Sequence, residues 1–181
     1  KRQTMKKTEL KWSSWTAVPV FVDSDGIQVN NSNDILHYID ERHGQLFPRH
    51  GENDVQDEWM AFSDNILGKS IVAVIYQNYR TSLHALDYVT KIDKFGLKDR
   101  IISKWIGAIV MKMVGRSRAK MFEEPPRQNL STQLNSMATA IDEDFFGGTT
   151  PNGADYANYG ILRSMQGLNG FDIVENHQII W

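Results

Sequence analysis

The spacing of the apolar residues changes near residue 53, and this change constrains the fold more than any other feature of the 181-residue chain. Before it, apolar residues form two short runs, residues 17–22 and 27–29, on either side of the turn residues 23–26. After it, they recur every three or four positions, which is the spacing along one face of an α-helix. The sequence therefore predicts a short α/β segment followed by an all-helical one.

The α/β segment begins with a predicted β-hairpin, because two β-branched and aromatic runs flank a Ser-Asp-Gly turn. Pro19 lies in the first run. A proline cannot donate a ladder hydrogen bond, so it is expected at a sheet edge, at a strand start, or in a cis peptide at a binding site. The capping residues 32–34 and the apolar spacing from Ile35 to Ile39 predict a helix that ends near Gly44. Residues 46–51 are predicted to be a linker between domains 1–50 and 51–181.

Helical spacing predicts the elements of the second domain. The helices are expected over residues 55–75, 82–92, 99–114, 129–144 and 152–167, and the breaks near 79–82, 95–96, 123–126 and 145–151. Trp59, Trp105 and the methionines are expected in the core. Asn152 and Asp155 predict a capping box at the start of the last helix, with Pro151 and Tyr156 placed as a hydrophobic staple.

Composition excludes several classes of function. The net charge is −2, so no basic field indicates a nucleic-acid partner. The chain has no cysteine, and its five histidines show no metal-like grouping, so no metal site is expected. The most apolar stretch, residues 101–114, contains two lysines and is shorter than the roughly 20 residues of a membrane span. The chain opens on Lys1 and stops at Trp181, and we interpret it as a piece of a longer protein, whose missing segments could hold a membrane anchor.

Two pairs of residues suggest a peptide-binding site. Val18, ahead of Pro19, can present its N–H and C=O to an extended ligand, and the predicted helix start at Asn31 and Ser32 offers amide donors and a positive dipole end to a carboxylate. Together these groups suit the γ-glutamyl end of a small peptide such as glutathione. An edge strand beside an ordinary helix cap remains the alternative.

Two further sets of residues each have a functional and a structural interpretation. Tyr79, Arg80 and Tyr88 either line a cleft between domains for an apolar cosubstrate or pack the domain interface. Arg116 and Arg118 either contact an anionic ligand or complement the dipole of the helix that they follow.

The chain resembles the glutathione S-transferase fold and, more finely, the membrane-associated prostaglandin E synthase type 2 family. The residues that carry this resemblance are Glu9, Leu10, Lys11, Trp12, Ser13, Ser14 and Trp15 before Val18, Pro19 and Val20; Tyr79, Arg80, Thr81, Ala85, Leu86, Asp87, Tyr88, Val89, Lys94, Phe95 and Gly96; and Gly147, Gly148, Pro151, Asn152, Ala154, Asp155, Tyr159, Gly160, Leu162, Arg163, Met165, Gly167 and Leu168. The last group is the most specific.

The resemblance implies an incomplete thioredoxin-like domain followed by an all-α domain of the transferase type. It implies that Val18 pairs its backbone with the cysteinyl group of glutathione, that Pro19 is the cis proline, and that Ser32 takes the γ-glutamyl carboxylate. Asn31 stands where the family usually has an acid. The family also implies haem as a candidate ligand, a homodimer, a lipid-like substrate, and isomerisation of prostaglandin H2 to prostaglandin E2.

The catalytic segment of that family lies upstream of Val18, in a βαβ unit with a Cys-x-x-Cys-type site. Only 17 residues precede Val18, and none is cysteine, so no catalytic residue is expected within this chain. The full-length protein is expected to be a glutathione-dependent isomerase or transferase, either cytoplasmic or peripherally associated with a membrane. The alternative is a non-catalytic module of the same fold that binds a protein or haem with glutathione.

Overall fold

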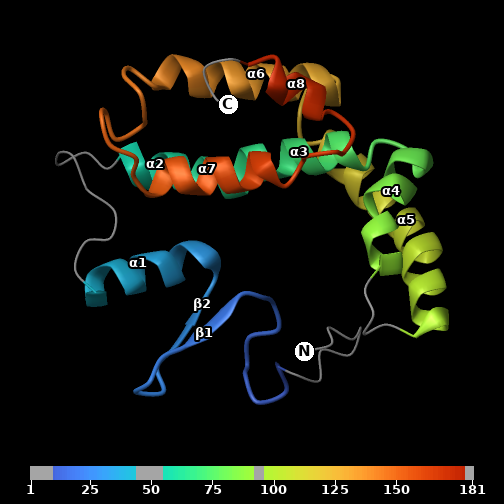
Figure 1. Cartoon of the computed structure of the whole chain (residues 1–181), viewed down its shortest axis with the longest axis horizontal. Coiled ribbons are helices and arrows are strands. Elements are labelled where there is room, and N and C mark those ends of the chain that lie inside the picture. Colours follow the sequence, from blue (N-terminus) through green and yellow to red (C-terminus); the bar gives the residue numbers. More distant parts are fainter. Residues whose placement is uncertain (1–9, 44–54, 92–95, 178–181) are drawn as a thin grey trace. The chain divides into compact units, whose positions relative to one another are not determined.

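The computed structural model describes residues 10–43, 55–91 and 96–177. The chain divides into two compact units, Lys1–Pro48 and Arg49–Trp181 (Figure 1). The predicted linker at residues 46–51 lies outside the described residues. The mostly helical content with one small sheet is compatible with a shortened thioredoxin-like segment and a helical transferase-type domain.

The first unit is the predicted hairpin followed by one helix. Strands β1 (Val20–Val22) and β2 (Gln28–Asn30) are antiparallel, with Val20 opposite Asn30, and helix α1 (Ser32–His43) follows directly. The Val18–Pro19 peptide is cis, and β1 begins one residue later. Pro19 therefore precedes the paired part of the strand, where its missing N–H removes no ladder hydrogen bond.

Hydrogen bonds hold the hairpin turn against α1. One carboxylate oxygen of Asp23 accepts the N–H groups of Asp25 at 2.8 Å and Ile27 at 3.0 Å. The other accepts the Tyr38 hydroxyl, and Arg42 forms ion pairs with Asp23 at 3.5 Å and with Asp25. The hydroxyl contact lowers the pKa of Asp23 and raises the pKa of Tyr38 to about 12. The turn and the helix are thus joined by a network that requires the carboxylate charged and the phenol protonated.

The described part of the second unit is built of helices, with one isolated β-bridge between Phe145 and Gly148. A continuous helical stretch comprises α2 (Val55–Phe62), a π-helical turn (Ser63–Leu67) and α3 (Gly68–Ile75). It is followed by α4 (Tyr79–Ala85), a 3₁₀ turn (Asp87–Lys91), α5 (Leu97–Ala119), α6 (Pro126–Ala140), α7 (Gly153–Arg163) and α8 (Phe171–Glu175). The main core gathers Leu67 and Val74 with Leu130, Leu134 and Leu162, so that α3, α6 and α7 share one apolar interior.

Several predicted boundaries are wrong. The predicted break at residues 79–82 is the first turn of α4, because Asn78 caps that helix: its side chain accepts the N–H of Thr81 at 3.0 Å. Helix α5 is longer than predicted, α6 begins three residues earlier and ends four earlier, and the sequence did not indicate α8.

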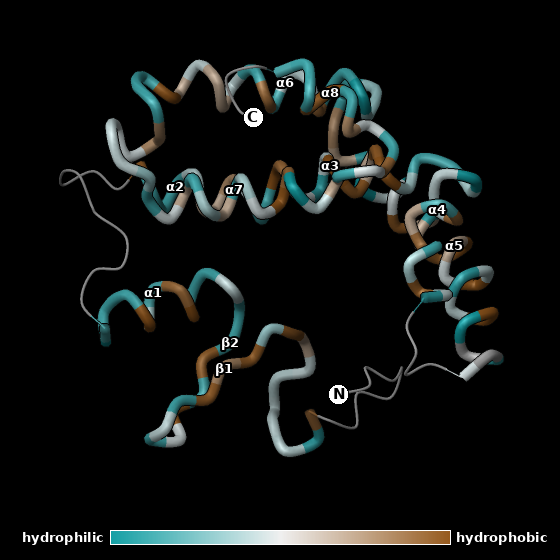
Figure 2. Tube along the Cα trace, viewed as in Figure 1, coloured by the Kyte–Doolittle hydropathy of each residue, from teal (hydrophilic) through white to brown (hydrophobic). Residues whose placement is uncertain are grey.

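The exposed face of α5 corrects another expectation. Trp105, predicted to lie in the core, is 51% exposed. It shares that exposure with six other apolar residues of α5, namely Ile101, Ile102, Ile106, Ile109, Val110 and Met113, and Figure 2 shows hydrophobic colouring along this helix. Within residues 10–43, 55–91 and 96–177, no helix combines the length and apolar character needed to cross a membrane.

Candidate functional site

The strand register brings the four predicted glutathione-site residues to one end of the hairpin. Because Val20 pairs with Asn30, Val18 and Pro19 leave the ladder at the same end at which Asn31 and Ser32 continue into α1. Val18 is 59% exposed. The predicted pairs, thirteen positions apart in the sequence, therefore lie at the same end of the hairpin.

The start of α1 presents its donors at this surface. The first N–H to bond within the helix is that of Ile35, which donates to the Asn31 carbonyl at 3.1 Å. The amides of residues 32–34 therefore point out of the helix end, where the dipole is positive. Asn31 has φ of 74°, a left-handed conformation that asparagine tolerates better than most residues, and its amide oxygen lies 3.5 Å from the Ser32 hydroxyl. The amide donors suit a carboxylate, and the same first turn of α1 carries the exposed carboxylate of Asp34.

The predicted cosubstrate residues lie in different surroundings. Tyr88 lines a cavity of about 550 Å³ bounded by α3, α4 and the end of α7. Tyr76 lines the same cavity, and burial, with a smaller contribution from Tyr88, raises its pKa. Tyr79 instead packs against a separate small cluster around Leu86, and Arg80 is exposed. Binding of a cosubstrate by these residues stays a prediction.

The predicted anion-contact residues lie in the last turn of α5. Arg116 is exposed, and the guanidinium of Arg118 lies 3.7 Å from the Met121 sulfur. Their position agrees with the dipole interpretation, and anion binding stays a prediction. Among the described residues, no three His, Cys, Asp or Glu side chains gather as a metal site would require.

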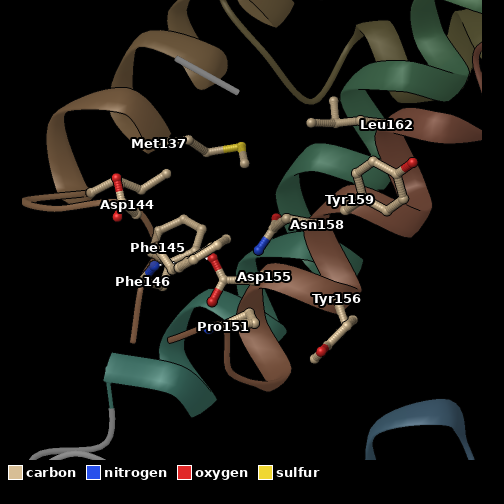
Figure 3. A pocket seen from close by; sticks show the side chains of 11 residues that line it. Met137, Asp144, Phe145, Phe146, Pro151, Asp155, Tyr156, Asn158, Tyr159 and Leu162 are labelled. Carbon is tan, nitrogen blue, oxygen red and sulfur yellow. Dashed lines mark hydrogen bonds between the residues drawn. The ribbon is translucent and has the colours of Figure 1, made fainter. Parts of the chain in front are cut away.

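Sequence reasoning missed a second cavity, of about 370 Å³, between α6, residues 141–151 and α7 (Figure 3). The predicted capping box lies at the start of α7, and its Asp155 lines the cavity. The Asn152 side chain accepts the N–H of Ala154 at 2.9 Å, and the Asp155 carboxylate accepts the N–H groups of Asn152 at 2.8 Å and Phe146 at 3.0 Å. The Gly-Gly-x-x-Pro-Asn motif was the available signal, since it fixes the loop that closes this space.

The fold and the hairpin surface are compatible with one class of protein. A hairpin entered through a cis proline, a helix starting at its end and a helical unit after it are compatible with the glutathione S-transferase fold, here shortened at its thioredoxin-like part. No protein-family model matches the chain.

Two curated proteins, both named prostaglandin E synthase 2, are similar to the chain. The Mus musculus protein is 26% identical over 228 residues, covering 97% of this chain and 59% of its own length. The Danio rerio protein is 25% identical over 219 residues, covering 94% of this chain and 58% of its own length. The chain is thus similar, at modest identity and over nearly its whole length, to proteins of the family that the sequence motifs indicate. It spans less than three fifths of the length of these relatives.

Proposed function

We propose that this chain contributes the γ-glutamyl half of a glutathione site to a glutathione-dependent isomerase or transferase of the prostaglandin E synthase 2 type. The relatives' shared name supports a related function, and the hairpin surface supplies groups suited to the peptide. Conversion of prostaglandin H2 to prostaglandin E2 is the reaction that the relatives' name suggests for the whole protein.

One observation carries the proposal: the pairing of Val20 with Asn30, which places the Val18 main chain beside the start of α1. An extended tripeptide can pair its cysteinyl N–H and C=O with Val18, as an added strand does. Its γ-glutamyl carboxylate then accepts hydrogen bonds from the Ser32 hydroxyl and the amides of residues 32–34, where the helix dipole favours negative charge. The proposed role of these residues is thus to bind and orient glutathione.

The cavity beside Tyr76 and Tyr88 is the proposed place for the apolar part of a second substrate. Its wall is mostly apolar, with Ile71, Ile75 and Ile161 among its residues, so it suits a hydrocarbon chain. Haem fits the hairpin surface poorly, since Val18, Pro19, Asn31 and Ser32 include none of the His, Met, Cys or Tyr side chains that ligate haem iron.

The test is a titration of the chain with glutathione, monitored by two-dimensional ¹H–¹⁵N NMR and by calorimetry. We expect shifts at Val18 and over residues 31–34, and a Kd that rises roughly tenfold or more in Ser32→Ala, because a hydrogen bond to a charged group contributes about 1.5–3 kcal/mol. Ser24→Ala, in the exposed hairpin turn, is the matched control and should bind like the parent chain. Saturable binding that ignores Ser32→Ala, or shifts confined to the helical unit, would contradict the proposal. The non-catalytic module remains the alternative if glutathione binds but the full-length protein turns over no substrate.

A further inference from the structure

The cavity of about 370 Å³ in the helical unit has the size and the lining of a small-molecule site. Its walls come from the end of α6, residues 141–151 and one face of α7 (Figure 3). Ligand sites are typically a few hundred Å³, mainly apolar, with a small number of placed polar groups. This cavity lies wholly within one unit and involves none of the residues proposed to bind glutathione.

The lining is rich in aromatic rings. Phe145, Phe146, Tyr156 and Tyr159 all line the cavity, and Phe146 stacks on Trp59 with ring centroids 4.8 Å apart. The stack helps to fix the position of the Phe146 ring, because moving this ring would break its contact with Trp59. A flat apolar ligand would pack against these aromatic rings.

Two polar side chains of the cavity, Asp155 and Asn158, form hydrogen bonds that hold its wall. Asp155 accepts two backbone N–H groups, as described above. The Asn158 side chain donates through Nδ2 to the carbonyls of Ala154 at 2.9 Å and Trp59 at 3.1 Å. Its Oδ1 has no hydrogen-bond partner among the described residues, although Asn158 is only 2% exposed.

The orientation of the Asn158 amide is set by its neighbours. Exchanging its oxygen and nitrogen would direct Oδ1 at two carbonyl oxygens, so Nδ2 must be the atom that faces them. A buried acceptor left without a donor carries a desolvation penalty, and native proteins rarely keep one without a reason. A water molecule in that place would need two to four polar partners, whereas Met137 and Leu162 present apolar atoms nearby.

We propose that this cavity binds a neutral aromatic molecule whose single hydroxyl group donates to Oδ1 of Asn158. A neutral ligand is required because Asp144 and Asp155 both line the cavity, and their charges disfavour an anion. A cationic donor would have to bury its charge against an amide oxygen, which is costly.

Met137 supplies the movement that binding needs. Oδ1 is shielded from solvent in this conformation, and Figure 3 shows the Met137 side chain directed toward Asn158 across the cavity. Methionine is unbranched and changes conformation readily, so the proposal assigns to Met137 the rotamer change that lets a hydroxyl group reach Oδ1.

The experiment uses the 181-residue chain and two matched probes, 1-naphthol and 1-methoxynaphthalene, which differ in the hydroxyl donor. Calorimetry should give a Kd roughly tenfold lower for 1-naphthol, because one hydrogen bond contributes about 1 kcal/mol and a buried acceptor gains a partner. The side-chain amide signal of Asn158 should shift with 1-naphthol and shift little with the ether. Equal affinities for the two probes, or no binding up to their solubility limits, would overturn the proposal.

Two variants locate the bound probe without disturbing Asn158, whose replacement could unfold the α2–α7 contact. Ile141→Trp fills the cavity from its half-buried edge and should abolish 1-naphthol binding. Val72→Trp, a half-buried residue lining the separate 550 Å³ cavity, should leave it unchanged. Binding lost only in Val72→Trp would assign the probe to that other cavity and refute the inference. Because glutathione binding is measured at Ser32, failure of either proposal leaves the other measurable.

Discussion

The two capping boxes of the helical unit separate the contribution of a helix cap from the contribution of burial. Asn78 at the start of α4 and Asn152 at the start of α7 each accept the N–H three residues later, and each receives the reciprocal bond. Asn78 is exposed, whereas Asn152 is only 4% exposed. Replacing each by alanine removes the same chemistry from two environments.

The expected costs differ because water can replace only one of the two caps. An N-cap asparagine contributes about 0.5–2 kcal/mol relative to alanine. At the exposed Asn78 site, water binds the released N–H groups, so we expect about 0.5–1 kcal/mol. At Asn152, the N–H groups of Ala154 and Asp155 lose their acceptor at 2.9 and 3.4 Å, and a buried donor without a partner costs about 1–3 kcal/mol more. Asn152→Ala should therefore cost about 2–4 kcal/mol.

The assay is urea unfolding of each variant. The unfolding is monitored by far-UV circular dichroism, which reports chiefly on the helical unit. The m-value must stay constant for the midpoints to give differences in the free energy of unfolding. Asn152→Ser, which keeps a capping oxygen, should recover part of the loss. If Asn78→Ala destabilised the chain as much as Asn152→Ala, burial would not set the cost, and the reasoning would fail.

Two further predictions concern the first unit and α5. The hydrogen bond to a carboxylate raises the pKa of Tyr38 from 10.0 to about 12. The contribution of this bond to stability is therefore complete below pH 10 and is lost as the pH rises through about 12. Tyr38→Phe should remove this pH dependence from the urea midpoints of the hairpin amides, measured by NMR. Ile109→Lys, on the exposed face of α5, should change the free energy of unfolding by no more than about 0.5 kcal/mol. Ala108→Lys, at the adjacent 0%-exposed position, should cost about 3 kcal/mol or more in the same urea assay, and equal costs would contradict the orientation of α5.

Local patterns in the sequence predicted the first unit well. The turn residues, the proline before β1 and the capping residues at α1 each act within a few positions, so the hairpin and helix could be read from them. The capping box at Asn152 was predicted for the same reason. These features depend on neighbours in sequence, and no tertiary contact overrides them.

Periodicity was less informative about which helix faces are covered. The spacing in α5 predicts a helix correctly but cannot show that Trp105 and its apolar neighbours face outward, because covering a face requires a partner element. The break predicted at Tyr79 was wrong for a related reason: Asn78 both ends one helical segment and caps the next.

The two candidate sites differ in how far the sequence could reveal them. Val18 and Ser32 lie at the same end of a tight hairpin, so this placement follows once the hairpin is predicted. Asn158 becomes notable only when its amide reaches the carbonyl of Trp59, 99 residues earlier, and leaves its oxygen without a donor. No spacing rule within α7 distinguishes that asparagine from one that caps or faces solvent. The unpaired acceptor is a property of the α2–α7 contact, which is why a site of this kind emerges from the packed structure and not from a motif.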